Sequence, residues 1–216
     1  MYERKIYQEC LARFAGTPLV KVLTGMRRVG KSTVMRLYRD QLAKDGAAPD
    51  QIIFVDMELL EFASIRNAAD LHAHVTERRL KNRDKRPQYL FIDEVQEITE
   101  WEKAVNSILN EGGFDIYLTG SNANLMSSEL ATLLTGRYVE IPVYPLSFAE
   151  YAVFRNTTPD EVLFGEYLRR GGMPGIHHME LDDETIRQYL GSLADSIILK
   201  DIVSRYVVRD IDLLRR

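Results

Sequence analysis

A glycine-rich stretch near the N-terminus carries residue types that suit a polyphosphate. It reads GMRRVGKST from Gly25 to Thr33 and matches the spacing G-x-x-x-x-G-K-[ST]. Glycines let backbone N–H groups turn toward phosphate oxygens; Lys31 is expected to bind and act on the β- and γ-phosphates, and Ser32 to ligate Mg²⁺. The predicted nucleotide contacts come from Gly25, Arg28, Val29, Gly30, Lys31, Ser32 and Thr33.

A pair of carboxylates follows the apolar run in YLFIDE. Its four largely apolar residues predict a buried strand whose carboxyl end delivers Asp93 and then Glu94. Asp93 fits as the outer partner of Mg²⁺, and Glu94 fits as the base that polarises an attacking water. The alternative is that the acidic pair begins a surface loop. This alternative is less favoured because a phosphate loop precedes the pair in the same chain.

Apolar runs typical of strands alternate with helical segments over most of the chain. The runs read PLVKVLTG, QIIFVDME, YLFIDE, DIYLTGSN and RYVEIPVYP, which predicts five strands. Such alternation is typical of a parallel sheet covered on both faces, and ligands bind such sheets at the carboxyl ends of the strands. The sequence therefore predicts an α/β fold of the P-loop NTPase type, with Asp93 and the loop at one edge.

Helix signals separate these runs. The segment STVMRLYRDQLAKDG ends at Gly46. The segment TEWEKAVNSILNEGG opens with Thr99 and Glu102 at the spacing of a capping box, and it closes on glycine. The connections between strands are therefore predicted to be mostly βαβ units.

The last third of the chain is predicted to be helical. Thr158 is expected to cap a helix that has Pro159 at its first position and ends at Gly171. We therefore expect an α/β core over residues 1–150 and a small helical lid domain over residues 151–216. The final segment still has helical apolar spacing where it stops, which predicts that a further C-terminal domain follows.

Composition narrows the functional classes. The formal charge of −4 over 216 residues argues against a protein coated in basic surface, so nucleic acid is not the default partner. Cys10 is the only cysteine, which excludes an internal disulfide and a cysteine-rich zinc site. No apolar run approaches the roughly 18 residues that span a bilayer, and we expect a cytoplasmic protein with no membrane contact and no metal beyond Mg²⁺.

These motifs resemble those of the AAA+-like P-loop ATPases of the additional-strand, catalytic-glutamate class. More closely, GMRRVGKST, FIDEVQ, YLTGSNA, ELATLLTGRY, YPLSFAEY and GGMPGI resemble a widespread family of predicted prokaryotic ATPases. The resemblance implies ATP and Mg²⁺ as ligands and places DIYLTGSN between the loop strand and the acidic strand. That strand should end in a polar sensor of the γ-phosphate, Ser121 or Asn122; Asn122 is preferred because its amide both donates and accepts. The alternative is a plain turn.

The resemblance also points to an arginine and to a glycine–proline turn. Arg137, in LLTGRY, would contact the γ-phosphate, often across a subunit boundary; the alternative is an ordinary surface arginine. In GGMPGI, Gly172 and Pro174 would lie against the adenine, as in switch-type ATPases; the alternative is a simple helix terminator. No arginine of a conventional AAA+ lid can be assigned, which argues against a ring-shaped motor.

Three functional classes follow. An ATPase that couples hydrolysis to movement of its lid is supported by Glu94 and Asn122. A slow ADP/ATP-gated switch or scaffold is favoured by the GGMPGI turn, and a small-molecule kinase fits least. The resemblance further implies a winged helix and a nuclease-like domain after this segment, so that a second copy, the chain's own continuation or DNA are the candidate partners.

Overall fold

The central element of the computed structural model is a five-stranded sheet in which all neighbouring strands run parallel. The structure describes residues 3–81, 88–121, 127–177 and 182–198. The strand order is β2-β3-β4-β1-β5, so β4 lies between the loop strand β1 and the acidic strand β3 and confirms the predicted sheet. The strands are β1 (Val20–Thr24), β2 (Ile52–Asp56), β3 (Gln88–Asp93), β4 (Phe114–Thr119) and β5 (Tyr138–Pro142).

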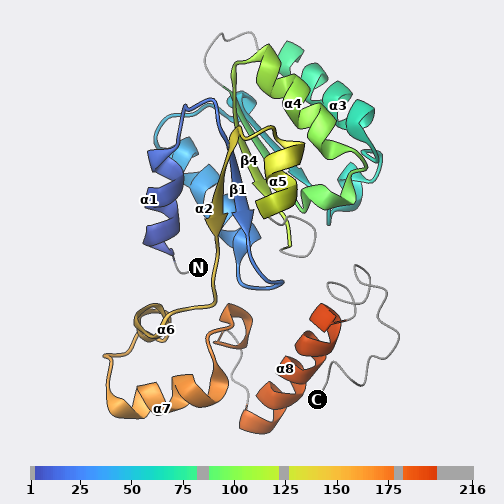
Figure 1. The fold of residues 1–216 in the computed structure, drawn as a ribbon. Coiled ribbons are helices and arrows are strands. Elements are labelled where there is room, and N and C mark those ends of the chain that lie inside the picture. Colours follow the sequence, from blue (N-terminus) through green and yellow to red (C-terminus); the bar gives the residue numbers. More distant parts are fainter. Residues whose placement is uncertain (1–2, 82–87, 122–126, 178–181, 199–216) are drawn as a thin grey trace.

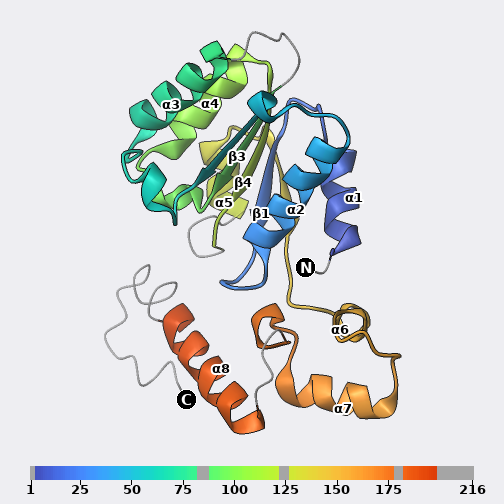
Figure 2. The same cartoon turned by 180° about the vertical axis from the view of Figure 1, so that it is seen from behind.

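Helices cover both faces of this sheet (Figures 1 and 2). On one face lie α1 (Lys5–Arg13) and α2 (Lys31–Lys44), whose apolar side chains pack with Leu23, Phe91 and Tyr117 of the strands. On the other face lie α3 (Ala68–Lys81), α4 (Trp101–Glu111) and α5 (Ser127–Leu133), packed on the opposite side chains of the same strands. The strands are buried on both faces, which explains their near-continuous apolar runs.

Three further helices form a region beyond the carboxyl edge of the sheet, α6 (Phe148–Phe154), α7 (Glu161–Arg170) and α8 (Asp183–Ile197) (Figure 1). We refer to α6, α7 and α8 as the helical region. Its buried Ile186 and Leu193 belong to the same apolar cluster as α1 and α2, so it packs on the core. Short 3₁₀ turns lie at Pro49–Gln51, Leu60–Phe62, Val95–Glu97 and Pro174–His177. Within the described residues, no helix is long and apolar enough to cross a bilayer.

The capping box predicted at Thr99 and Glu102 is wrong. The helix α4 begins at Trp101, and Glu100 before it has a left-handed backbone with φ +56° and no side-chain cap. Thr99 instead forms an isolated parallel bridge with Asn67. This pairing holds the Thr99 backbone beside the segment that precedes α3. Glu100, rather than Thr99, then takes the position before α4, and the Thr99 hydroxyl does not cap that helix.

The predicted cap of α7 is also wrong by two residues. Asp160, rather than Thr158, precedes the helix, and its carboxylate accepts a hydrogen bond from the Leu163 backbone N–H at 2.7 Å. An aspartate caps as well as a threonine does, so the sequence offered two equivalent starts and Pro159 did not decide between them. The predicted end at Gly171 is confirmed, because this glycine follows the last helical residue with φ +73°.

Candidate nucleotide site

The glycine-rich loop joins β1 to α2 and is held tightly against the end of β5. Gly25 has φ +144°, and a Cβ on it would lie 2.3 Å from the Val143 carbonyl oxygen. The Val143 N–H donates to the Thr24 carbonyl at 2.7 Å, which fixes this approach. Gly30 precedes α2 with φ +100°. Only glycine fits at Gly25, and the loop delivers the positive end of α2 to whatever it encloses.

Lys31 spans the inside of this loop. Its side chain is buried, and its Nζ donates to the Gly25 and Met26 carbonyls, each at 3.0 Å. These contacts hold the ammonium group against the backbone of the loop. A phosphate placed in the loop would meet this ammonium and the N–H groups at the start of α2 together.

Asp93 ends β3 directly beside the loop. Its Oδ1 accepts hydrogen bonds from the Ser32 hydroxyl at 3.0 Å and from the Thr119 hydroxyl. Its Oδ2 is buried and accepts no hydrogen bond from the described residues. A hydroxyl–carboxylate pair with one buried carboxylate oxygen that accepts no hydrogen bond from the described residues fits the hard oxygen ligands that Mg²⁺ takes.

Burial raises the pKa of Asp93 above its ordinary value. The Thr119 and Ser32 hydrogen bonds oppose this shift, and the nearby charges of Asp56 and Glu94 add to it. The pKa is raised because the negative charge of the carboxylate is poorly stabilised: little water surrounds it, and other carboxylates lie close by. The Arg36 guanidinium lies 3.5 Å from Oδ2, and a further cation there would add to the compensation that it gives.

Glu94 follows Asp93 in an uncommon backbone conformation. Its φ is +54°, and its N–H donates to the Thr119 hydroxyl oxygen at 3.0 Å. The left-handed backbone turns the half-buried side chain toward the same cavity that Lys31 lines. The Gln96 amide donates to one Glu94 carboxylate oxygen, so this carboxylate is already engaged. Strained residues of this kind concentrate at functional sites.

A cavity of about 450 Å³ opens over the loop. One end is lined by the loop and by Glu94, and the other is lined by apolar side chains from both the core and the helical region. The apolar members are Leu37, Leu146, Phe154, Pro174 and Leu193. A site with one cationic, N–H-rich end and one apolar end suits an amphiphilic ligand such as a nucleotide.

The GGMPGI turn reaches the cavity through Pro174 and Gly175. Pro174 Cγ lies 4.0 Å from the position that a Cβ on Gly30 would take. Gly172 lies outside the cavity wall: its carbonyl accepts from the Leu146 N–H at 2.7 Å, and a Cβ on it would lie 2.3 Å from the Leu146 oxygen. Gly172 therefore serves the close packing of the turn, and Pro174 is the member of the predicted pair that faces the ligand space.

Arg28 links the loop to the helical region. It has φ +64°, and its guanidinium donates to the Tyr189 hydroxyl at 3.0 Å and lies over that ring, 5.7 Å from its centre. Tyr189 belongs to α8. The arginine thus contacts α8 as well as lining the cavity.

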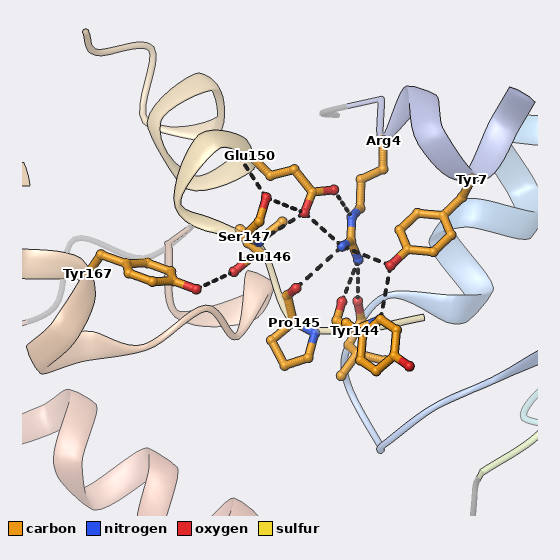
Figure 3. Close-up of polar contacts among 9 residues, drawn as sticks. Arg4, Tyr7, Tyr144, Pro145, Leu146, Ser147, Glu150 and Tyr167 are labelled. Atoms are coloured by element: carbon orange, nitrogen blue, oxygen red, sulfur yellow. Dashed lines mark hydrogen bonds and ion pairs between the residues drawn. The ribbon is translucent and has the colours of Figure 1, made fainter. Parts of the chain in front are cut away.

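A buried arginine at the start of the chain joins the loop, the sheet and the helical region (Figure 3). Arg4 pairs with Glu150 through two contacts, Nε to Oε1 at 2.7 Å and Nη2 to Oε2 at 3.0 Å. Its Nη1 donates to the Tyr144 carbonyl at 2.8 Å and to the Val29 carbonyl of the loop at 3.3 Å. Glu150 also accepts from Ser147 in the capping box that starts α6.

We call this cluster, Arg4 with Glu150 and the Val29, Tyr144 and Pro145 carbonyls, the junction. In Figure 3 the guanidinium lies between the Glu150 carboxylate and the Tyr7 ring, whose hydroxyl accepts from the Tyr144 N–H at 3.0 Å. The ring centre is 4.5 Å from the guanidinium carbon. The junction therefore fixes the crossing from β5 to α6 against the loop.

Arg137 lies away from the cavity, and Asn122 lies outside the described residues. Arg137 precedes β5 at the amino edge of the sheet, opposite the loop, and its guanidinium donates to Asn110 at 2.6 Å and Asn106 at 3.2 Å. It is therefore not part of the site within one chain. Ser121, the other predicted sensor, is fully buried.

Four residues of the site escaped the sequence reasoning, Arg4, Arg36, Asp56 and Thr119. Asp56 and Thr119 end β2 and β4, so the rule that carboxyl ends of parallel strands meet at one edge could have found them. The only signal in the sequence for Arg36 is its position on α2, shortly after the loop. No spacing signal connects Arg4 to residues more than a hundred positions away.

Comparison with known proteins identifies a family and a shared fold. A family model described as an AAA domain matches residues 17–152. An "Uncharacterized protein" of Haemophilus influenzae is 38% identical over 220 residues, which cover 100% of this chain and 54% of that protein. The uncharacterized protein MJ1544 of Methanocaldococcus jannaschii is 32% identical over 204 residues, covering 89% of this chain and 44% of that protein. The chain spans about half the length of these curated relatives.

A solved structure shares the fold. The Walker-type ATPase paby2304 of Pyrococcus abyssi superposes with a TM-score of 0.59 at 17% identity, over 94% of this chain and 75% of that chain. At this identity the likeness bears on the fold alone. It agrees with the α/β arrangement that the strand order gives.

Proposed function

This chain belongs to the AAA domain family, and we propose that it binds ATP with Mg²⁺ and hydrolyses it to ADP and phosphate. We further propose that nucleotide state moves the helical region as a lid, with the core over residues 1–150 and the lid over residues 151–216. Nucleotide binding and ATPase activity are general properties at the level of the family and fold. Hydrolysis by named residues and lid movement are the specific parts of the proposal.

We assign the triphosphate to the loop and the base to the apolar end of the cavity. The Gly30 to Thr33 backbone and the start of α2 would donate N–H groups to the phosphates, and Lys31 would exchange its two carbonyl contacts for phosphate oxygens. Leu37, Leu146 and Pro174 would pack on the base. The cavity volume of about 450 Å³ suits one nucleotide.

Ser32 and Asp93 would hold Mg²⁺, through the hydroxyl and the carboxylate Oδ2. When bound, the ion neutralises charge that develops on the phosphates. Thr119 orients the carboxylate by donating to its other oxygen and by accepting from the Glu94 N–H. The hydroxyls of Ser32 and Thr119 thus keep Asp93 Oδ1 satisfied while Oδ2 stays available.

Glu94 would act as the base. Its carboxylate accepts the proton of a water whose oxygen attacks the γ-phosphorus, the bond to the β,γ-bridging oxygen breaks, and ADP leaves with that oxygen. The observation that carries the proposal is that Lys31, Ser32 and Glu94 line one cavity while Ser32 is bonded to Asp93 at 3.0 Å.

The test is the variant Glu94→Gln, which keeps the side chain's size but removes its basic oxygen. It should lose at least about a hundredfold in phosphate release while binding ATP as the wild type does. The matched control is Glu97→Gln, an exposed glutamate one turn away, which should leave both measurements unchanged. Full hydrolysis by Glu94→Gln would move the base to another residue.

Lid movement is supported by contacts between the nucleotide loop and the helical region. Arg28 reaches Tyr189 of α8, and Arg4 joins the Val29 carbonyl to Glu150 of α6. Because Pro174 and Leu193 form the opposite wall of the cavity, a nucleotide would touch both sides at once. A change at the γ-phosphate would then alter loop contacts that the helical region shares.

A slow-turnover switch is the second candidate, and the Gln96 contact favours it. The Gln96 amide donates to one oxygen of the Glu94 carboxylate, so this oxygen must be released before it can accept a proton. An enzyme whose base rests in such a contact would turn over slowly until a partner or effector domain shifts the equilibrium. Retained ADP with slow phosphate release would identify this behaviour.

A further inference from the structure

Arg36 lies between two buried carboxylates at the carboxyl edge of the sheet. Asp56 and Asp93 end β2 and β3 and are paired in register, so their side chains emerge next to one another. The Arg36 Nη2 lies 2.7 Å from Asp56 Oδ2 and 3.5 Å from Asp93 Oδ2. One guanidinium therefore serves two carboxylates, one of which is the proposed partner of Mg²⁺.

Burial strengthens the electrostatic interactions among these three charged side chains. The Asp56 and Asp93 side chains are 4% and 0% exposed, whereas that of Arg36 is 40% exposed. Asp56 Oδ1 accepts a further hydrogen bond from the Glu58 N–H at 3.1 Å, which fixes its orientation. Two carboxylates at this spacing repel each other in a low dielectric when both are charged, and the guanidinium between them offsets that repulsion.

We propose that Arg36 is a positioning residue that keeps the Asp93 carboxylate from taking up a divalent cation before a nucleotide arrives. The inference rests on the proposed function. A cation that approaches Asp93 Oδ2 without a nucleotide meets the guanidinium 3.5 Å from that oxygen. When the cation arrives with ATP, the phosphates supply the remaining negative charge and outweigh this repulsion.

The rest of the site agrees with this order of binding. Within the described residues, no group of three or more histidine, cysteine, aspartate or glutamate side chains is arranged to hold a metal ion. Among the residues that the structure describes, the site thus offers Ser32 and Asp93 but no complete set of ligands. Arg36 would turn this incomplete site into one that requires the nucleotide.

Removing the guanidinium should allow the nucleotide-free protein to bind a divalent cation. In Arg36→Gln, Asp56 and Asp93 face each other without a cation, so a divalent ion becomes the favoured counter-charge. With an effective dielectric constant of about 20, a charge at this distance should shift the affinity for a divalent cation by about tenfold or more. The metal-free binding of ADP should weaken, because the phosphates then meet an uncompensated pair of carboxylates.

The experiment measures Mn²⁺ binding to nucleotide-free protein by the loss of the free-ion electron paramagnetic resonance signal. Mn²⁺ is used because it occupies the same oxygen sites as Mg²⁺. Arg36→Gln should bind Mn²⁺ about tenfold or more tightly than the wild type. The double variant Arg36→Gln/Asp56→Asn, which restores the net charge of the cluster, should return to the wild-type affinity, and Arg36→Lys should stay near it.

The matched control is Arg39→Gln. Arg39 lies one turn further along α2 and pairs with the exposed Asp40 at 2.7 Å, so its loss changes the net charge equally without touching Asp56 or Asp93. Arg39→Gln should bind Mn²⁺ as the wild type does. Equal or weaker Mn²⁺ binding by Arg36→Gln, or an equal gain in Arg39→Gln, would overturn the inference.

A second variant covers the case in which Arg36→Gln fails to fold. Asp56→Asn leaves Arg36 with one carboxylate partner, so metal-free ADP binding should tighten several-fold, an effect that damaged folding cannot produce. Unchanged or weaker ADP binding by Asp56→Asn would contradict the proposal. If the wild type binds no ATP with Mg²⁺, the proposed function fails instead, and that result is separate from the Mn²⁺ comparison.

Discussion

Arg4 offers a quantitative test of how the nucleotide loop is tied to the helical region. The variant Arg4→Gln removes the guanidinium and leaves the Glu150 carboxylate, whose side chain is 17% exposed, without its cation. It also strips the Tyr144 and Val29 carbonyls of a donor. The change therefore acts on α1, on the loop and on α6 at the same time.

The magnitude follows from burial. Breaking a buried ion pair by removing one partner costs about 3–5 kcal/mol. Glu150 keeps the hydrogen bonds from Ser147 and some water, so we expect about 2–3 kcal/mol for Arg4→Gln. The variant Glu150→Gln should cost less, about 1–2 kcal/mol, because Arg4 keeps its carbonyl acceptors.

The assay is urea unfolding followed by the fluorescence of Trp101, the single tryptophan, which is buried at the start of α4. The double variant Arg4→Gln/Glu150→Gln should cost less than the sum of the single changes, by about 1–2 kcal/mol of coupling. ADP affinity should also fall by roughly tenfold in Arg4→Gln, which corresponds to a loss of about 1.4 kcal/mol of binding free energy when the junction is broken.

The control is Arg13→Gln, an exposed arginine in the last turn of α1. It should change the unfolding free energy by less than about 0.5 kcal/mol. The reasoning is refuted if Arg4→Gln is as stable as Arg13→Gln. It is also refuted if the Arg4 and Glu150 changes are additive.

Three further outcomes are expected. Gln96→Ala should raise the rate of phosphate release at unchanged ATP affinity, because it frees Glu94; a slower rate would make Gln96 a residue that positions the base. Gly25→Ala should lower the melting temperature far more than Gly46→Ala: a Cβ at Gly25 lies 2.3 Å from Val143, whereas nothing lies within 4 Å at Gly46, and both have positive φ. Burial alone would raise the pKa of Glu150, but Arg4 and Ser147 outweigh it and hold that pKa below its ordinary value of 4.5. The ion pair therefore stabilises the fold above about pH 4.5 and is lost as the pH falls further, so urea unfolding of wild type and Glu150→Gln should converge at acid pH; a constant difference would contradict this.

The strand pattern allowed the sheet to be predicted because the strands are largely apolar runs, of which β1 to β4 end in a polar residue and β5 ends at Pro142. The run that ends in Asp93 and the loop that contains Lys31 are local signals, and both emerge at the same edge as expected. Lys21 is less regular: it lies in the middle of β1, fully buried, and pairs with Asp115 of β4. This pair depends on the register of two strands that are far apart in sequence, so periodicity alone could not have paired them.

The contacts that the sequence did not reveal are long-range ones. Arg4 and Glu150 are 146 residues apart, and each looks like an ordinary surface charge in its own segment. Arg137 is a different case: the family resemblance suggested a phosphate contact, often across a subunit boundary, and the direction of β5 places Arg137 at the other edge of the sheet within one chain. The predicted helix start was wrong where two residues that can cap a helix lie close together, as Thr158 and Asp160 do.

The most direct test of the central claim is the equilibrium binding of ATP with Mg²⁺ to wild type and to Lys31→Ala, together with phosphate release. Lys31 is the buried cation at the centre of the loop. The control is Lys44→Ala at the exposed end of the same helix. We predict saturable binding by wild type and Lys44→Ala and at least about tenfold weaker binding by Lys31→Ala, with loss of hydrolysis. Equal ATP affinity in wild type and Lys31→Ala would contradict the assignment of this loop to the phosphates.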